Sequence, residues 1–271
     1  MEATLGNELG RGSEVDVTTP NIARIYDYFL GGSANFAVDR EAGENFLRVF
    51  PRNVEWSQIN RSFLGRAVRY LCTKAAVDQF LDLGSGVPTV GNVHEIAQIQ
   101  NPAARVVYVD IEPVAIHHAR HLLEGTETAT AIEADIRDPK AVLEAASGWL
   151  DFDRPVAVLA VAIFDLLDLA DPAGLVAAYR DACVPGSALV LSHTVPMDMS
   201  DSEIAGVTEV MRQTSTPNVQ YRTYDDIAAL FSGYHLVAPG LVPSAQWHPE
   251  QPVSEQDAAR SNGYAGLGLL R

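Results

Sequence analysis

The chain of 271 residues is 47% hydrophobic and 20% charged, a composition that supplies a folded core and excludes a disordered or fibrous protein. Its 19 Lys and Arg residues against 35 Asp and Glu residues give a formal net charge of -16, which disfavours nucleic acid and anionic membranes as partners. The longest apolar run, at 156–164, is too short to span a membrane, and two cysteines are too few for a disulfide scaffold.

The first 75 residues carry helical patterns and no strand pattern. Residues 1–19 mix acidic residues with glycines, show no secretory signal, and predict a mobile tail on a cytoplasmic protein. Gly31 and Gly32 end the first helical pattern, since glycine tolerates the left-handed conformation that follows a helix. We therefore expect an N-terminal helical cap over residues 20–75. Its apolar side chains recur at the spacing of a helix in three stretches, 21–30, 39–50 and 54–72.

Residues 76–271 alternate short β-rich runs with helical stretches, which predicts a doubly wound α/β domain on a mostly parallel sheet. The run 156–164 has no polar face and is typical of a central strand buried on both sides. The expected strands lie at 77–83, 105–110, 130–135, 155–164 and 187–193, with weaker ones at 235–238 and 264–270. The expected helices lie at 90–100, 113–123, 140–149 and 173–182, with weaker ones at 203–213 and 227–231.

A glycine-rich turn follows the first expected strand and is the sharpest feature of the sequence. Residues 81–86 read LDLGSG, and such glycines let the backbone turn tightly and let a ligand approach closely. Because ligands of open α/β sheets bind at the carboxyl ends of strands, we expect Gly84, Ser85 and Gly86 to contact a cofactor. A dinucleotide fingerprint needs a third glycine or alanine where this chain has Thr89, which weakens the case for NAD.

Acidic residues close three consecutive expected strands. Asp82 precedes the glycine turn, where a carboxylate suits a ligand with an ammonium group better than one with a pyrophosphate. Asp110 can accept hydrogen bonds from both ribose hydroxyls of an adenosine, and Asp135 can take the exocyclic amine of adenine. S-adenosylmethionine carries all of these groups. The ribose contact fits NAD equally well, and Asp82 and Asp135 alternatively cap the turn or helix that follows each of them.

With these residues, the chain resembles a class I S-adenosylmethionine-dependent methyltransferase. In particular, it resembles an actinobacterial family of methyltransferases formerly classed as a domain of unknown function, from residue 20 to the C-terminus. The blocks that carry the resemblance are 21–32 (NIARIYDYFLGG), 35–36 (NF), 39–40 (DR), 60–64 (NRSFL), 80–89 (FLDLGSGVPT), 91–95 (GNVHE), 106–110 (VVYVD), 134–139 (ADIRDP), 192–193 (SH) and 263–266 (GYAG).

The resemblance implies a seven-stranded sheet whose last strand, near 264–270, is antiparallel, with a helical cap over the cofactor. It implies S-adenosyl-L-methionine as the cofactor and S-adenosyl-L-homocysteine as the product. We expect the acceptor to be an unidentified small molecule, since the acidic surface disfavours nucleic acid. Besides the acidic residues and the glycine turn, the expected cofactor-binding residues are Tyr26, Asn35, Arg40, Ile111, Ile136 and Ala162.

Methyl transfer requires alignment of the acceptor and exclusion of water more than a covalent protein group. For a hydroxyl acceptor, His193 at the end of the fifth expected strand is the candidate general base. Tyr26 and Tyr28 are candidate orienting residues from the cap. The alternative for His193 is a strand-end residue whose ring is satisfied by the backbone.

Residues 31–36 are small and polar enough to fold over a ligand as a lid. In that interpretation Asn35 and Arg40 are polar contacts, and Arg40 meets the carboxylate of the methionine moiety. The alternative is simple helix packing, with the two glycines ending the helix.

Family members of this kind often carry a histidine near the position of Phe164, and its absence predicts altered specificity or no turnover if that histidine serves chemistry. The second hypothesis is therefore a non-catalytic S-adenosylmethionine-binding or sensing protein, and an NAD-dependent oxidoreductase is a weak third. His117 and His121 lie four apart on one helix face without a third ligand, so we expect no metal site. Trp247 and His248 either line an acceptor pocket or cover the sheet.

Overall fold

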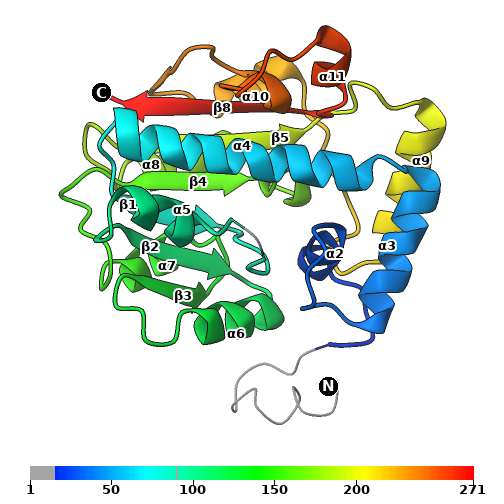
Figure 1. The fold of residues 1–271 in the computed structure, drawn as a ribbon, viewed down its shortest axis with the longest axis horizontal. Helices are drawn as coiled ribbons and strands as arrows, with labels where there is room; N and C mark the ends of the chain where they lie inside the picture. The colour runs from blue at the N-terminus through cyan, green and yellow to red at the C-terminus, as the bar shows by residue number, and fades with distance from the viewer. Residues whose placement is uncertain (1–15, 90) are drawn as a thin grey trace.

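A computed structural model describes residues 16–89 and 91–271 of the chain, so most of the predicted tail lies outside the described residues. The strands form one sheet in the order β3-β2-β1-β4-β5-β8-β6, and the short β7 pairs with β8 beside this path (Figure 1). Strands β1 to β5 are parallel, whereas β8 is antiparallel to β5, which confirms the expected fold class. The strands are β1 (Gln79–Leu83), β2 (Arg105–Asp110), β3 (Ala129–Glu133), β4 (Ala157–Val161), β5 (Ala188–Thr194), β6 (Tyr234–Leu236), β7 (Val242–Pro243) and β8 (Gly263–Leu270).

The helices begin where the sequence provides caps. Asp138 and Asp171 each accept a hydrogen bond from the backbone of the following helix, and each is followed by a proline at the first helical position. Thr223 forms a capping box with Asp226. None of the described helices is long and apolar enough to cross a membrane. The helices are α2 (Ile22–Phe29), α3 (Ala37–Val49), α4 (Asn53–Lys74), α5 (Val93–Gln100), α6 (Pro113–Leu122), α7 (Pro139–Ala146), α8 (Pro172–Arg180), α9 (Asp201–Met211), α10 (Tyr224–Ala229) and α11 (Glu255–Ala259), with short 3-10 turns η1 (Phe164–Leu166) and η2 (Ser244–Gln246).

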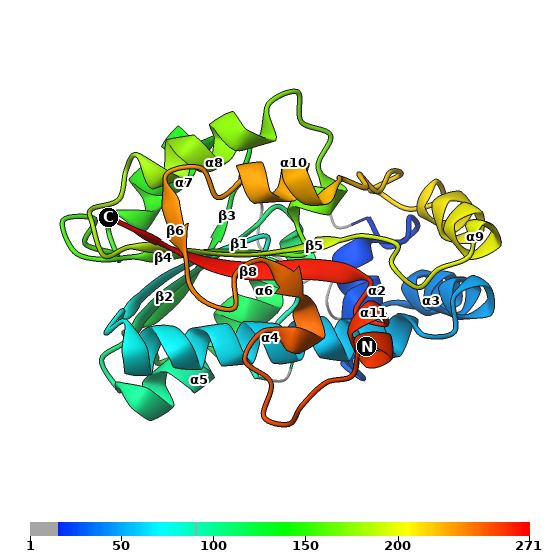
Figure 2. The same ribbon diagram turned by 90° about the horizontal axis from the view of Figure 1, so that it is seen from above.

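The two faces of the sheet are buried by different sets of helices, as Figure 2 shows with α7, α8 and α10 on one side and α4 and α5 on the other. The side chains of the strands alternate between these layers. In β2, Val106 and Tyr108 pack with α4, α5 and α6, whereas Val107 and Val109 pack on the opposite side. Burial on both faces explains why the central strands read as continuous apolar runs in the sequence.

The helices that precede the sheet in the chain pack in two different places. Helix α4 lies along one face of the sheet, where Phe63, Val68 and Leu71 join its core, so most of its length belongs to the sheet layer. In Figure 1, α2 and α3 stand with α9 beyond the carboxyl ends of the parallel strands. Ile25, Phe46 and Met211 hold these three helices together in a core of their own. This group of helices covers the sheet edge at which a ligand would bind.

The central strand is shorter than the apolar run that predicts it. Strand β4 ends at Val161 because Ala162 adopts a left-handed conformation, with φ of 54°. The rest of the run enters η1, which places Phe164 and Asp165 at the carboxyl edge of the sheet. Since β1 lies between β2 and β4, the crossovers diverge from β1 in opposite directions, which makes its carboxyl end the topological switch point.

Candidate functional site

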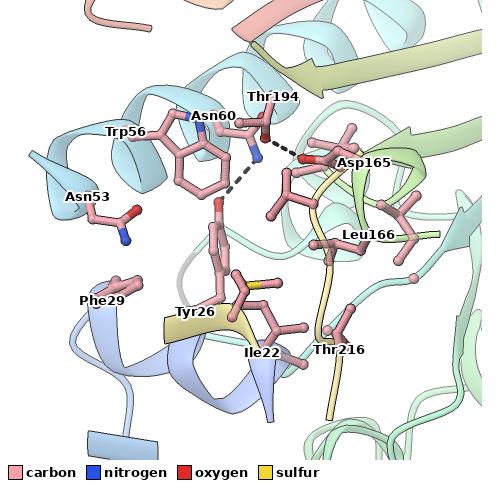
Figure 3. A pocket seen from close by; sticks show the side chains of 18 of the residues that line it. Ile22, Tyr26, Phe29, Asn53, Trp56, Asn60, Asp165, Leu166, Thr194 and Thr216 are labelled. Atoms are coloured by element: carbon pink, nitrogen blue, oxygen red, sulfur yellow. Dashed lines mark hydrogen bonds between the residues drawn. The ribbon is translucent and has the colours of Figure 1, made fainter. Parts of the chain in front are cut away.

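A cavity of about 260 Å³ lies between the carboxyl ends of the parallel strands and the helices that cover them. Its lining has two halves of different chemistry. The strand-end half comprises residues 82–87 and 110–112, which follow β1 and β2. The helical half comprises side chains of α2, α3, α4 and α9 together with segments 165–167 and 216–221. Figure 3 shows labelled side chains of α2 and α4 converging on this space with Asp165, which follows β4, and Thr194, which lies at the end of β5.

The glycine turn after β1 adopts a backbone conformation that favours glycine and is hydrogen-bonded to β2. Gly84 and Gly86 have φ values of 65° and 64°, in the left-handed region that favours glycine. The N–H groups of Gly84 and Ser85 donate to the carbonyl of Val109, at 2.8 and 3.0 Å, and tie the turn to β2. A Cβ on Gly84 would lie 2.4 Å from Cγ1 of Ile163, whereas a Cβ on Gly86 would meet nothing within 4 Å. Gly84 is therefore required by packing, and Gly86 keeps the floor of the cavity open.

Asp82 and Asp110 are buried carboxylates that line the cavity. Burial raises the pKa of Asp82 to about 7, with the guanidinium of Arg61 opposing the shift and the charge of Asp110 adding to it. Oδ2 of Asp110 accepts from the N–H of Gly86 at 2.7 Å, and Oδ1 accepts from the N–H of Glu112 at 2.9 Å. Burial raises the pKa of Asp110 against the effect of these bonds. Both carboxylates are costly to bury and lack a close ion-pair partner among the described residues, as expected for groups that meet a ligand.

The structure brings eight of the twelve sequence-predicted cofactor residues to this cavity and leaves four outside it, of which Asp135 and Ile136 follow β3. Asp135 forms a two-pronged ion pair with Arg137, with a closest N–O distance of 2.6 Å, and Ile136 packs in the core. Neither residue lines the cavity, so the geometry favours a capping role for Asp135, whose Oδ1 accepts from the backbone N–H of Arg137 at 2.9 Å. The predicted residues that do line it are Tyr26, Asp82, Gly84, Ser85, Gly86, Asp110, Ile111 and Ala162.

The expected lid segment is held by an internal acid and does not reach the cavity. Oδ2 of Asp27 accepts from the N–H of Ala34 at 2.9 Å and from the side-chain amide of Asn35 at 2.8 Å. Arg40 in turn donates to the carbonyl of Asn35 at 2.9 Å, and the hydroxyl of Tyr28 bonds Glu44 on the surface. Asn35, Arg40 and Tyr28 are absent from the described lining, so the geometry favours helix packing for this segment.

His193 is fully buried, and both of its ring nitrogens are engaged. Nδ1 lies 2.9 Å from the carbonyl oxygen of Thr194, and Nε2 lies 2.7 Å from Nη1 of Arg222. Since a guanidinium can only donate, Nε2 accepts and Nδ1 carries the proton of a neutral ring. Burial lowers the pKa of His193, which favours the same neutral form. His193 does not line the cavity, and its geometry is that of a positioned structural histidine.

In the segment after β4, Asp165 lines the cavity, whereas its neighbour Phe164 does not. The ring of Phe164 is 1% exposed and packs in the core, so this position faces away from any ligand. The next residue, Asp165, lines the cavity and accepts a hydrogen bond from the hydroxyl of Thr194 (Figure 3). Sequence reasoning missed both Asp165 and Thr194. The available signal was an acid directly after the apolar run of the central strand.

Tyr26 and Asn60 are fixed in the cavity wall by a chain of hydrogen bonds. The N–H of Ala162 donates to the hydroxyl of Ser192 at 3.0 Å, and that hydroxyl donates to Oδ1 of Asn60 at 2.7 Å. The amide of Asn60 donates to the hydroxyl of Tyr26 at 3.3 Å, which donates to the carbonyl of Ser57 at 3.0 Å (Figure 3). Burial raises the pKa of Tyr26, so its phenol stays protonated.

A buried ion network joins helix α2 to the strand-end half. The guanidinium of Arg24 contacts Asp39 at 2.9 Å and Glu112 at 3.1 Å, and its side chain is 2% exposed. The side-chain amide of Asn21 donates to the same carboxylate of Glu112 at 2.7 Å. Glu112 and Asn21 both line the cavity, so the start of α2 closes over the segment that follows β2. This docking was not predicted, because the interacting residues lie about ninety positions apart.

The remaining expectations concern Trp247 and metal binding. Trp247 is fully buried, with its ring 5.5 Å from that of Phe63, so it covers the sheet and does not line the cavity. The described residues contain no group of three or more His, Cys, Asp and Glu side chains that could hold a metal ion.

Comparison with known proteins gives consistent matches. The family model described as S-adenosyl methyltransferase matches residues 9–271. A crystal structure of a candidate methyltransferase from Thermobifida fusca YX is 38% identical, with a TM-score of 0.88 over 94% of this chain and 97% of that one. A protein of the DUF574 family from Streptomyces avermitilis MA-4680 is 33% identical, with a TM-score of 0.88 over 94% of this chain and 99% of that one.

More distant structures share the fold alone. An O-methyltransferase family protein from Burkholderia thailandensis is 13% identical, with a TM-score of 0.50 over 85% of this chain and 70% of that one. Among curated proteins, none matches this chain.

Proposed function

The chain belongs to the S-adenosyl methyltransferase family, and from this membership we propose that it methylates a small molecule held in the helical half of the cavity. One observation carries the proposal. A single cavity joins the glycine turn and its two buried carboxylates to an apolar chamber walled by aromatic side chains. An acceptor bound there would lie next to a cofactor bound at the strand ends.

The residues of the strand-end half fit S-adenosylmethionine, which when bound supplies an electrophilic methyl group on a sulfonium. The open face of Gly86 leaves room for a ligand against the backbone. Asp82 is placed to pair with the ammonium group, and the guanidinium of Arg61 is the charge that suits the carboxylate of the methionine moiety. The expected role of Arg40 thus passes to Arg61. Each oxygen of Asp110 accepts one backbone N–H and keeps a lone pair for a ribose hydroxyl.

The protein's own contribution is alignment and exclusion of water. The helical half presents Phe29, Phe46, Phe50 and Trp56, whose rings exclude water from the space beside the cofactor. The edge-to-face contact of Trp56 with Tyr26, at 5.9 Å between ring centroids, keeps the wall rigid. An acceptor that is held against such a wall loses little further freedom on reaction.

Calorimetric titration with S-adenosylmethionine, S-adenosylhomocysteine and NAD tests the cofactor. We expect micromolar binding of the first two and none of NAD. Formation of S-adenosylhomocysteine with a panel of aromatic alcohols and amines then separates an enzyme from a sensing protein, which would bind the cofactor without turnover. Failure of both S-adenosyl compounds to bind would refute the proposal.

A further inference from the structure

The side chain of Asp165 has an unmet hydrogen-bonding need. It is 2% exposed, and its Oδ2 accepts from the hydroxyl of Thr194. Its Oδ1 has no hydrogen-bond partner in the part of the chain that the structure describes. The described residues include two further buried polar atoms without a partner, on Asp27 and Trp247, and neither residue lines the cavity. Since a buried carboxylate oxygen without a donor is costly, its persistence beside a cavity indicates that a ligand supplies the donor.

The protein itself offers no donor for this oxygen among the described residues. Arg222 interacts electrostatically with Asp165, but its Nη1 donates to the carbonyl of Phe164 and to His193, each at 2.7 Å, and Oδ1 of Asp165 receives no hydrogen bond from it. The amide of Asn60 donates to Tyr26. Figure 3 shows Asp165 and Tyr26 on facing sides of the same space.

The charges that line the cavity restrict what can bind near Asp165. In the described lining, the one guanidinium is that of Arg61, which acts on Asp82 at the strand-end half. Apart from Arg61, which α4 contributes, the described lining of the helical half carries one charged side chain, the carboxylate of Asp165. The guanidinium of Arg222 interacts with Asp165 but lies outside the described lining, so an anionic acceptor would meet the carboxylate and not that cation. An ammonium or hydroxyl group would instead donate to the free oxygen.

The surrounding wall adds a second preference. The rings of Tyr26, Trp56 and Tyr221 line this half and present apolar faces that stack on a ring or attract a cation. We propose that Asp165 recognises the methyl acceptor, and that the acceptor is a small apolar or aromatic molecule with a hydroxyl or amine group and no anionic group. This inference rests on the proposed function, of which it names the acceptor class.

The test uses three probes that share one ring: benzylamine, benzyl alcohol and benzoate. Each is titrated by ligand-observed NMR into the full-length protein saturated with S-adenosylhomocysteine. We expect the amine and the alcohol to bind at least about tenfold more tightly than benzoate. Asp165→Asn should weaken the binding of benzylamine about tenfold and reduce the difference in affinity between benzylamine and benzoate. The matched control is Asp168→Asn, which changes the same charge at an exposed position three residues along and should change nothing.

The outcomes separate this inference from the proposed function. Equal binding of benzoate and benzylamine to the wild type overturns the inference, and this comparison needs no variant. An unchanged preference in a folded Asp165→Asn variant also overturns it. S-adenosylhomocysteine affinity is measured first in the same wild-type protein. If that affinity is absent the proposed function fails, and the probes are then compared without it. If it is present but the probes show no preference, the inference alone fails.

Discussion

The carboxylate of Asp82 is expected to lower the stability of the ligand-free protein in return for cofactor binding. Burial raises its pKa from 3.8 to about 7, which at 1.36 kcal/mol per pH unit corresponds to about 4 kcal/mol once the group is ionised. Because the folded state holds the proton more tightly than the unfolded state, the cost is absent below about pH 4 and grows as the pH rises to about 7. Asp82→Asn removes the charge at nearly constant shape.

We therefore expect the Asp82→Asn variant to be more stable than the wild type without cofactor. At about 2–4 °C per kcal/mol, the melting temperature should rise by about 10 °C at pH 8 and by about 4 °C at pH 5. The measurement is thermal unfolding at both pH values, with the exposed Asp153→Asn as the control for loss of one surface charge.

The same variant should bind S-adenosylmethionine about 10- to 100-fold more weakly, because it loses a charged hydrogen bond to the ammonium group. In the wild type, affinity should fall as the pH drops below about 7, since protonated Asp82 cannot pair with a cation. Titration calorimetry across this range checks both statements. A variant that is no more stable than the wild type at pH 8, or whose advantage does not change with pH, would refute the reasoning.

Three further predictions test other parts of the structure. Gly84→Ala should destabilise the protein severely, because its Cβ would lie 2.4 Å from the side chain of Ile163. Gly86→Ala should cost only about 1–2 kcal/mol of stability and mainly weaken cofactor binding. Chemical denaturation compares the stability of the two variants, and calorimetry compares their cofactor affinity. Arg24→Met should cost about 3–5 kcal/mol because two buried carboxylates lose their partner, against little change for the exposed Arg40→Met, as measured by urea unfolding. His193→Gln should lower the melting temperature and leave the affinity for S-adenosylhomocysteine unchanged. A variant that keeps its stability but loses this affinity would indicate that His193 takes part in ligand binding.

Sequence patterns predict the sheet and the strand-end half well, because both depend on local order. An apolar run, a glycine turn and an acid after each strand place Gly84, Asp82 and Asp110 at one edge, since parallel strands share the direction of their carboxyl ends. The same pattern places Asp135 after β3, but this residue does not line the cavity. Its neighbour Arg137, two positions on, satisfies the carboxylate locally, and no periodicity reveals such a pair.

The helical half could not be predicted, because its wall is assembled from segments far apart in the chain. Thr194 at the end of β5 donates a hydrogen bond to Asp165, which follows β4. Arg24 of the helical cap forms an ion pair with Glu112, which follows β2. The expected lid residues lie outside the cavity lining for the opposite reason. Asn35 and Arg40 bond each other and Asp27 locally, so a polar segment that suggests a ligand instead completes its own turn.

If cofactor and acceptor bind in the two halves of the cavity as proposed, the ion pair and hydrogen bond between α2 and Glu112 should couple their binding. Glu112 follows Asp110 by two residues, while the other end of the ion pair lies on the helix that carries Tyr26. A nucleoside that steadies the first segment will also steady the helix against which an acceptor must dock. By linkage, the acceptor then raises the affinity for the nucleoside by the same factor. We therefore expect S-adenosylhomocysteine to bind more weakly once the methylated product has left, so that the product leaves first and the nucleoside second.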